Sequence, residues 1–161
     1  MKIVVFADSH TDVATMVMVV KKEKPQLVIH LGDHIADGIL LQEMYPEIPM
    51  ELVPGNTDFD TDHPYEKTIV QEGKRIYMTH GDRYHVHLGL SRIFYKGESI
   101  QADVILFGHT HTPYLENKSG IRMMNPGRIG CVSNNFIHAT YGIILLRNYK
   151  ICCSIEEVSN S

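Results

Sequence analysis

The stretch ADVILFGHTHTP (residues 102–113) joins a short apolar run directly to a glycine and a pair of histidines. The run VILF has the composition and length of a buried β-strand. Gly108 permits a tight exit from that strand, because glycine tolerates backbone conformations that other residues avoid. In an extended segment His109 and His111 project from the same face, while Thr110 faces the other way and can hydrogen-bond a supporting group. Such an ending indicates a functional edge of a sheet if other strands end alike.

Four further apolar runs end in polar residues of the same chemical kind. The runs KIVVFA, QLVIHL, MELV and RIYMT are interpreted as strands at residues 2–7, 26–31, 50–53 and 75–79. They are followed, in this order, by Asp8-Ser9-His10, Gly32-Asp33-His34, Gly55-Asn56-Thr57-Asp58 and His80-Gly81-Asp82. Since the carboxyl ends of parallel strands share one edge, where ligands bind, we expect these polar residues to converge.

The order of the elements indicates an α/β fold with two sheets. Helices predicted at residues 12–23 and 37–45 separate the first three strands, which is the β-α-β-α-β pattern of a parallel sheet. The later part of the chain is typical of hairpins, with one more helix and one more buried strand. The hairpin strands are expected at residues 67–71 and 75–79, at 114–117 and 120–124, and at 139–148 and 150–158. The helix is expected at residues 86–100 and the buried strand at 103–107. Two stacked sheets with helices outside satisfy this order, and we expect residues 1–161 to form a single domain.

The composition narrows the class of protein. The formal net charge is −4 and the basic residues form no run, so we expect no nucleic-acid-binding surface. No apolar run approaches the ~18 residues that span a membrane, so we expect no membrane contact. The three cysteines (Cys131, Cys152 and Cys153) make neither a disulfide framework nor a C-x-x-C metal motif. The N-terminal apolar run reaches a charge at Asp8 without a small-residue cleavage site, and we therefore expect a cytoplasmic protein.

Converging aspartate, histidine and asparagine side chains are costly to bury without a charge partner. A pair of metal ions removes that cost. Oxygen and imidazole ligands suit divalent first-row metals such as Mn, Fe, Ni or Zn. A carboxylate can bridge two such ions about 3.5–4 Å apart, which is the spacing used in two-metal phosphoryl chemistry.

The motifs D-x-H, G-D, G-N-x-D, H-G and G-H-T-H, in this order, resemble those of the calcineurin-like metallophosphoesterases. Together with NPGR at residues 125–128, they make the chain similar to the small bacterial and archaeal phosphodiesterase family of that superfamily. The resemblance covers residues 2–147. Each motif alone is weak, but five of them in the right order, each after an apolar run, are highly specific.

The resemblance implies an αββα sandwich of two mixed β-sheets flanked by helices. It implies a phosphodiesterase in which a metal-bound water or hydroxide attacks phosphorus in line at a dinuclear site. The implied cofactors are two divalent ions per chain, with Mn²⁺ favoured and Fe, Ni, Zn or Mg as alternatives. The implied ligands are Asp8, His10 and His111 on one ion, Asn56, His80 and His109 on the other, and Asp33 as the bridge. Asn56, Asp58 and Asp33 are the residues expected to take part in catalysis.

Two positions depart from the family pattern. Many superfamily members have a histidine after the asparagine of G-N, where it stabilises charge or protonates the leaving oxygen; here Thr57 stands there and cannot be charged. The neighbouring Asp58 is then expected to orient Asn56 or to hold a water molecule. The small family often shows H-G-H, whereas this chain has Asp82 at the third position. The identity of any general acid stays open.

Other residues near these motifs have competing interpretations. His30 lies inside a strand and is expected to be a hydrogen-bonded core residue rather than a ligand. His34 is interpreted as a loop residue, with phosphate binding as the alternative. His85 and His87 are expected on a solvated face, with substrate contact as the alternative. The NPGR loop is expected to pack under the site, and Arg128 is the residue of that loop with the reach to contact phosphate.

The alternatives to a phosphodiesterase are a phosphomonoesterase or a nuclease of the same fold, or a non-catalytic scaffold. A eukaryotic relative in the superfamily, a subunit of a coat complex, keeps the fold as an interaction scaffold with impaired metal sites. The complete ligand set argues against that role here, and the acidic charge argues against a nuclease. The expected partners are a small phosphodiester substrate and, as an open alternative to a monomer, further copies of the chain.

Overall fold

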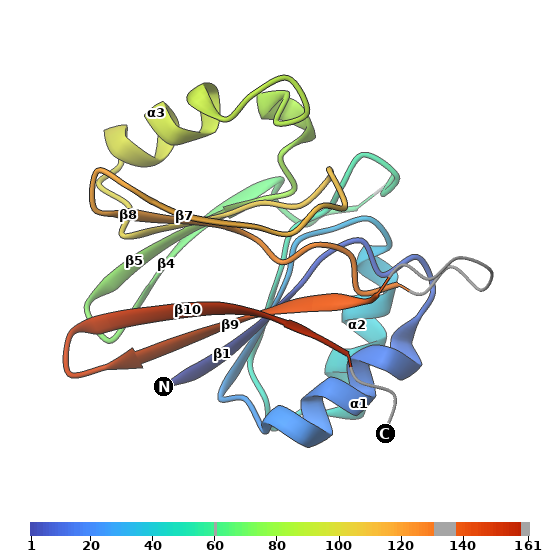
Figure 1. Ribbon diagram of the computed structural model, residues 1–161. Helices are drawn as coiled ribbons and strands as arrows, with labels where there is room; N and C mark the ends of the chain where they lie inside the picture. The colour runs from blue at the N-terminus through green and yellow to red at the C-terminus, as the bar shows by residue number, and fades with distance from the viewer. Residues whose placement is uncertain (60, 131–137, 159–161) are drawn as a thin grey trace.

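Two five-stranded β-sheets lie face to face in the computed structural model, which describes residues 1–59, 61–130 and 138–158. Helices α1 (Val13–Glu23) and α2 (Ile35–Met44) cover the outer face of one sheet, and α3 (Ser91–Ser99) covers the outer face of the other (Figure 1). The layers follow the order helix, sheet, sheet, helix, as the family resemblance implies.

The first sheet has the order β10-β9-β1-β2-β3. Its strands are β1 (Lys2–Phe6), β2 (Leu27–His30), β3 (Met50–Leu52), β9 (Thr140–Arg147) and β10 (Lys150–Glu157). The first three run parallel, and β9 and β10 add an antiparallel hairpin beside β1. Phe6 is in register with His30, and His30 with Leu52, so the three parallel strands end at the same level.

The second sheet has the order β4-β5-β6-β8-β7. Its strands are β4 (Glu66–Gln71), β5 (Lys74–Thr79), β6 (Val104–Leu106), β7 (Tyr114–Lys118) and β8 (Ile121–Asn125). The parallel strands β5, β6 and β8 form the centre, and an antiparallel strand pairs with each side of it. Both sheets are therefore mixed.

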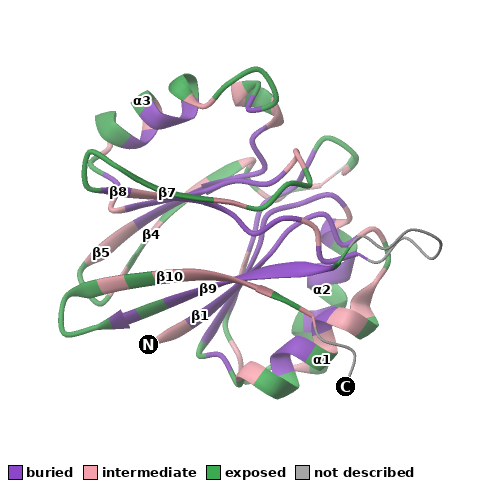
Figure 2. Ribbon diagram, in the orientation of Figure 1, coloured by how far each residue is buried: buried purple, intermediate pink, exposed green. Residues whose placement is uncertain are grey.

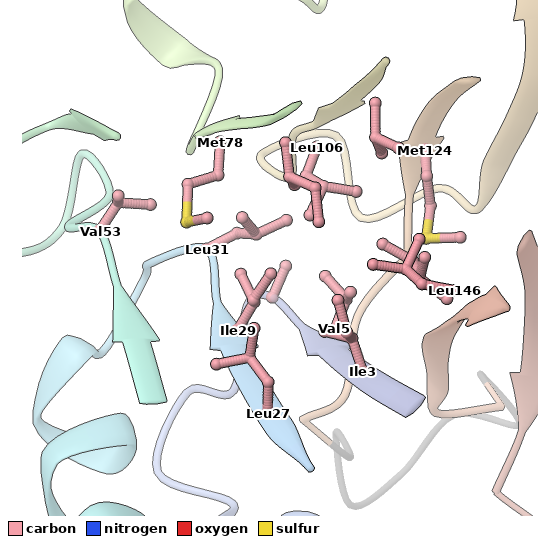
Figure 3. Close-up of a cluster of buried hydrophobic side chains, with 14 residues drawn as sticks. Ile3, Val5, Leu27, Ile29, Leu31, Val53, Met78, Leu106, Met124 and Leu146 are labelled. Carbon is pink, nitrogen blue, oxygen red and sulfur yellow. The ribbon is translucent and has the colours of Figure 1, made fainter. Parts of the chain in front are cut away.

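The sheets are held together by apolar side chains that alternate along each strand. In β1, Ile3 and Val5 point into the layer between the sheets, whereas Val4 and Phe6 pack against the helices. Figure 3 shows the inner layer, where Ile29 and Leu31 lie opposite Met78 and Leu106 of the second sheet. The central strands are buried on both faces (Figure 2), which explains why their sequences are continuous apolar runs rather than alternating ones.

Most of the predicted elements are present, but the helix expected at 86–100 is wrong in its first five residues. Only Ser91–Ser99 is helical, and a short 3₁₀ helix, η1 (Asp82–Tyr84), precedes it. Gly89 has φ +147°, which an α-helix cannot accommodate, so the segment before it stays irregular. The helix expected at 12–23 begins after Asp12, whose carboxylate accepts a hydrogen bond from the Thr15 amide at 3.0 Å.

Within the described residues, no helix is both long enough and apolar enough to cross a lipid bilayer. Cys152 and Cys153 lie on β10 as free thiols. Cys131, which the sequence analysis placed with them, lies outside the described residues.

Glu66 connects four elements of the second sheet and its helical cover. One carboxylate oxygen of this β4 residue accepts hydrogen bonds from Tyr77 on β5 (2.7 Å) and Tyr84 on η1 (2.6 Å). The other accepts one from Lys96 on α3 at 2.9 Å. Burial alone would raise the pKa of Glu66, but the three donors outweigh it and lower the pKa from 4.5 to about 2. The irregular segment before α3 is thereby fastened to the sheet.

Replacing Glu66 by glutamine should destabilise the protein by roughly 1 kcal/mol at pH 7, after allowance for the partial exposure of the group. Because the folded-state pKa is depressed, the contribution of Glu66 is fully present above about pH 4.5 and is lost as the pH falls towards 2. Urea unfolding of both proteins at pH 7 and pH 3 measures this. The difference in free energy of unfolding between wild type and Glu66→Gln should be smaller at pH 3. A difference that stays constant would contradict the stabilising role of the charged Glu66. Glu43→Gln, on an exposed position of α2, is the control.

Candidate metal centre

The polar strand ends meet where the two sheets approach each other. Within the first sheet, the Asp8 amide donates to the Gly32 carbonyl at 3.0 Å. Within the second, the Gly108 amide donates to the His80 carbonyl at 2.8 Å. The His80 ring joins the two sheets, because its Nδ1 lies 2.8 Å from the carbonyl oxygen of Leu31. The expected convergence is therefore confirmed, with the strand ends coming from both sheets.

Glycines make this close approach feasible. A Cβ atom on Gly32 would clash with the backbone of Pro54 and Gly55, and one on Gly55 would clash with Asp33. A Cβ atom on Gly108 would lie 2.9 Å from the Cβ of Ala7. The loops that carry the polar residues thus pack backbone against backbone, which any larger residue would prevent.

The first group of side chains consists of Asp8, His10, Asp33 and His111. One potential ligand atom from each lies within 4.8 Å of the others. Nε2 of His111 is 3.4 Å from Oδ1 of Asp8, and this carboxylate raises the pKa of His111. Burial lowers the pKa of His10 and so favours the neutral imidazole that binds metals.

The Asp8 carboxylate is the clearest evidence that this group fits a cation. The residue is fully buried, and neither of its oxygens accepts a hydrogen bond from any described residue. Nε2 of His10 is likewise buried and without a hydrogen-bond partner among the described residues. Buried polar groups in proteins are almost always satisfied, and an unsatisfied carboxylate costs several kcal/mol. A divalent ion among these atoms would satisfy all three.

A second group adjoins the first and contains Asn56, His80 and His109. Oδ1 of Asn56 lies 3.1 Å from Nε2 of His80 and 2.9 Å from Nδ1 of His109. Nδ1 of His80 must carry the proton, because its partner, the Leu31 carbonyl, can only accept. In the neutral ring, Nε2 then presents a lone pair to Oδ1 of Asp33, 3.4 Å away. A cation between these atoms would remove the repulsion, so the second group also fits a metal.

Asp33 stands between the two groups. Its Oδ1 accepts hydrogen bonds from the amide (3.2 Å) and the hydroxyl (3.0 Å) of Thr57. Burial would raise the pKa of Asp33, but the charge of His80, when that ring is protonated, and the Thr57 hydrogen bonds lower it overall. The carboxylate is thus held in its charged form, as a shared ligand would require.

Asp58 holds the loop that carries Asn56 through backbone amides. Its Oδ2 accepts from the Gly55 amide at 2.8 Å, and its Oδ1 accepts from the amides of His34 (3.0 Å) and Ile35 (2.9 Å). Because both oxygens bind backbone, Asp58 fastens the loop after β3 to the start of α2. These contacts are typical of a positioning residue rather than a catalytic one.

The backbone is strained at most of the candidate ligands. Of the seven, five have positive φ: Asp8 (55°), His10 (44°), Asp33 (54°), His109 (71°) and His111 (59°). Such a conformation costs a residue with a side chain about 1 kcal/mol or more, although aspartate and histidine tolerate it better than most. Strain concentrated on one set of neighbouring residues is typical of a functional site.

His30 is a hydrogen-bonded core residue, as expected. Burial lowers its pKa to about 4, so the ring is neutral near pH 7. Its Nδ1 accepts from the Gly32 amide at 3.2 Å, and its Nε2 lies 3.0 Å from the Ser9 hydroxyl. Ser9 in turn donates to Asp37 of α2 at 2.6 Å. Sequence reasoning missed Ser9 and Asp37, since nothing in their local sequence indicates this contact.

The NPGR loop packs beneath the site, also as expected. Nδ2 of Asn125 donates to the Gly108 carbonyl (2.9 Å) and to the Thr110 hydroxyl (3.0 Å), which confirms Thr110 as a supporting group. Nε of Arg128 donates to the Gly130 carbonyl at 2.9 Å, and its charge opposes protonation of His10. The role of Asn125 in holding the G-H-T-H loop was not foreseen.

Among the remaining histidines, His34 is the N-cap residue that precedes α2, and its ring centroid lies 5.4 Å from that of His10. His87 is exposed, as expected of a solvated face, but its ring centroid is 5.6 Å from that of His109. Asp82 lies in η1, close enough for its charge to favour protonation of His109, although burial lowers the pKa of that ring overall.

Comparison with known sequences places this geometry in context. The profile of the calcineurin-like phosphoesterase superfamily domain matches residues 1–148. A probable metallophosphoesterase of Bacillus subtilis is 32% identical over 132 residues, which is 80% of this chain and 75% of that protein.

Solved structures share the fold at lower sequence identity. A protein of Streptococcus pneumoniae described as a predicted phosphoesterase has a TM-score of 0.79 and 22% identity, over 97% of this chain and 88% of that one. Vacuolar protein sorting 29 of Cryptosporidium parvum has a TM-score of 0.73 and 17% identity, over 99% and 98%. A structure described as a novel archaeal phosphodiesterase has a TM-score of 0.70 and 18% identity, over 97% and 100%.

Proposed function

The chain belongs to the calcineurin-like phosphoesterase superfamily, and from that premise we propose that it is a divalent-metal-dependent phosphodiesterase. The observation that carries the proposal is the Asp8 carboxylate, which is fully buried, has no hydrogen-bond partner among the described residues, and lies beside three other potential ligands. A carboxylate in such surroundings is stable only beside a positive charge.

The proposed centre holds two ions. Asp8, His10 and His111 would bind one, Asn56, His80 and His109 the other, and Asp33 both. When bound, divalent ions lower the pKa of water and screen the negative charge of a phosphate group. Oxygen and imidazole donors do not select strongly among first-row metals, and manganese is the ion we propose for this set.

The chain's own residues hold this arrangement in place. The Leu31 carbonyl fixes the His80 tautomer, so that Nε2 faces the centre. Thr57 holds one oxygen of Asp33, and Asp58 holds the loop that carries Asn56. Because Thr57 is neutral, the G-N-T-D loop offers no cation to a second negative charge on a substrate. This favours diesters, which carry one charge at neutral pH, over monoesters, which carry nearly two.

Side-by-side rates on bis-p-nitrophenyl phosphate and p-nitrophenyl phosphate test this preference. With Mn²⁺ in saturating amounts, the diester should be hydrolysed faster. A monoester rate clearly above the diester rate would make the protein a phosphomonoesterase, which is the alternative of the same fold. Activity should disappear on treatment with a chelator and return when Mn²⁺ is added.

Substitution of Thr57 distinguishes the contribution of its hydroxyl hydrogen bond to Asp33 from that of its amide hydrogen bond. Thr57→Val keeps the volume and the amide hydrogen bond but removes the hydroxyl that donates to Asp33. Turnover should fall about tenfold or more, as for other residues that support a metal ligand. Thr57→Ser restores the hydroxyl and should restore most of the rate. If the valine variant keeps full activity, the hydroxyl has no part in positioning Asp33.

The competing role is an interaction scaffold, because vacuolar protein sorting 29 shares the fold. Elemental analysis of protein purified without added metal, combined with the diester assay, distinguishes the two. Bound transition metal with turnover supports the enzyme. Protein that binds no metal after saturation and hydrolyses no diester would favour the scaffold.

A further inference from the structure

A cavity of about 530 Å³ opens beside His109 on the side of the second sheet. It lies between the irregular segment before α3 and the segment that connects β6 to β7. Its volume falls within the range of roughly 300–1,000 Å³ that is typical of small-molecule sites. His109 is both a wall of the cavity and a neighbour of Asn56, so the cavity adjoins the candidate metal centre.

Most of the cavity wall is apolar. Phe107 and Tyr114 form one side, with ring centroids 6.0 Å apart and planes inclined by 53°. Val86, Leu90 and Pro113 complete the apolar part. The lining residues, all of them described, include no lysine, arginine, aspartate or glutamate. A charged group would be poorly solvated here, so the cavity suits an uncharged part of a ligand.

The other lining residues are polar, and one of them, His109, adjoins the candidate centre. The rings of His87 and His109 have centroids 5.6 Å apart, and Thr110 and Thr112 add hydroxyl groups. Four rings in the lining favour a flat ligand, because aromatic groups stack and pack edge to face. Polar atoms among them suit a heterocycle more than a hydrocarbon chain.

We infer that this cavity binds the aromatic substituent of a small phosphodiester, a nucleoside ester being the class that fits best. This inference rests on the proposed function: the phosphate would sit at the candidate centre and the ring beyond His109. A polynucleotide fits less well, because no basic side chain lines the cavity and the chain carries a net charge of −4.

Two esters with the same leaving group test the inference. Thymidine 5′-(p-nitrophenyl phosphate) and methyl p-nitrophenyl phosphate release the same nitrophenolate and differ only in the substituent that is retained. The nucleoside ester should show a KM about tenfold lower, as expected for one stacked base. Equal KM values for the two esters would overturn the inference.

Thr112→Trp is the blocking variant, because Thr112 is an exposed residue of the cavity lining and is not a candidate ligand. It should remove the advantage of the nucleoside ester, measured as the ratio of the KM values of the two esters, so that any effect common to both esters cancels. Thr112→Ser is the matched control and should keep the advantage. Leu90→Ala, a second variant, should reduce the same advantage by removing apolar contact. An advantage that survives both Thr112→Trp and Leu90→Ala would overturn the inference.

A binding measurement separates failure of this inference from failure of the proposed function. If neither ester is hydrolysed in the presence of Mn²⁺, the proposed function is wrong and turnover no longer informs on the cavity. Saturation-transfer NMR with free thymidine, which has no phosphate, then decides. Binding to wild-type protein that is lost in Thr112→Trp supports the cavity as an aromatic site, whereas no binding to wild-type protein overturns it.

Discussion

Replacement of Asp33 by asparagine should lower diester hydrolysis by roughly 10³-fold or more, since a metal centre contributes several kcal/mol to such reactions and each 1.36 kcal/mol is about a factor of ten. The change preserves shape but removes the charge of the residue that adjoins both candidate ligand groups. It should also reduce the metal content measured by elemental analysis after saturation and dialysis.

Glu43→Gln, which removes one negative charge at an exposed position of α2, is the control and should leave both quantities unchanged. Metal content and turnover would respond differently if Asp33 only stabilised the folded structure. The Asp33→Asn variant would then lose stability while keeping its metal and its turnover per folded molecule, and the shared-ligand role would be wrong.

Asp8→Asn should have opposite effects on the metal-free and metal-loaded protein. Without metal, Asp8 is a buried charge with no hydrogen-bond partner among the described residues, so its neutral analogue should raise the free energy of unfolding by about 1–3 kcal/mol. Asparagine also tolerates the positive φ of 55° at this position. With metal, wild-type protein should gain about 2.7 kcal/mol at one hundred times the dissociation constant, and the variant should gain much less.

Urea unfolding in a chelator and with added Mn²⁺ measures both effects. The comparison belongs at about pH 9, well above the ordinary pKa of histidine, because the Asp8 carboxylate raises the pKa of His111 and a protonated His111 would stabilise Asp8 in the wild type. The Thr57→Ser variant, which keeps every candidate ligand, should respond to metal as the wild type does. A metal-free Asp8→Asn variant that is clearly less stable than the wild type would show that Asp8 has a structural partner.

The sequence predicts the strand ends well because their signals are local. Continuous apolar runs indicate strands buried on both faces, and Gly32 and Gly108 mark exits that only glycine permits. The fold class follows from the order of these elements. What local signals do not contain is the approach of one sheet to the other, so the link between His80 and Leu31 becomes visible only in three dimensions.

The same distinction explains the residues that were missed or misplaced. Asn125 and Ser9 act through partners about 15 to 28 residues away in the chain, and no spacing rule connects them. Asp58 was expected to orient Asn56 or to hold a water molecule, and the backbone amides of Gly55, His34 and Ile35 occupy its two oxygens. The helix predicted at 86–100 begins only at Ser91, after Gly89, and the irregular segment before it forms one wall of the cavity.

The positive φ angles at five candidate ligands also bear on how such a sequence evolves. A site that holds its side chains in strained conformations is maintained only while selection acts on activity, because glycine or asparagine there relaxes the backbone and a neutral residue in place of aspartate removes a buried charge. Once hydrolysis is no longer required, such replacements make the metal-free domain more stable rather than less. Descent from an enzyme to a stable, inactive domain is therefore downhill in free energy, and recovery of the lost activity is uphill.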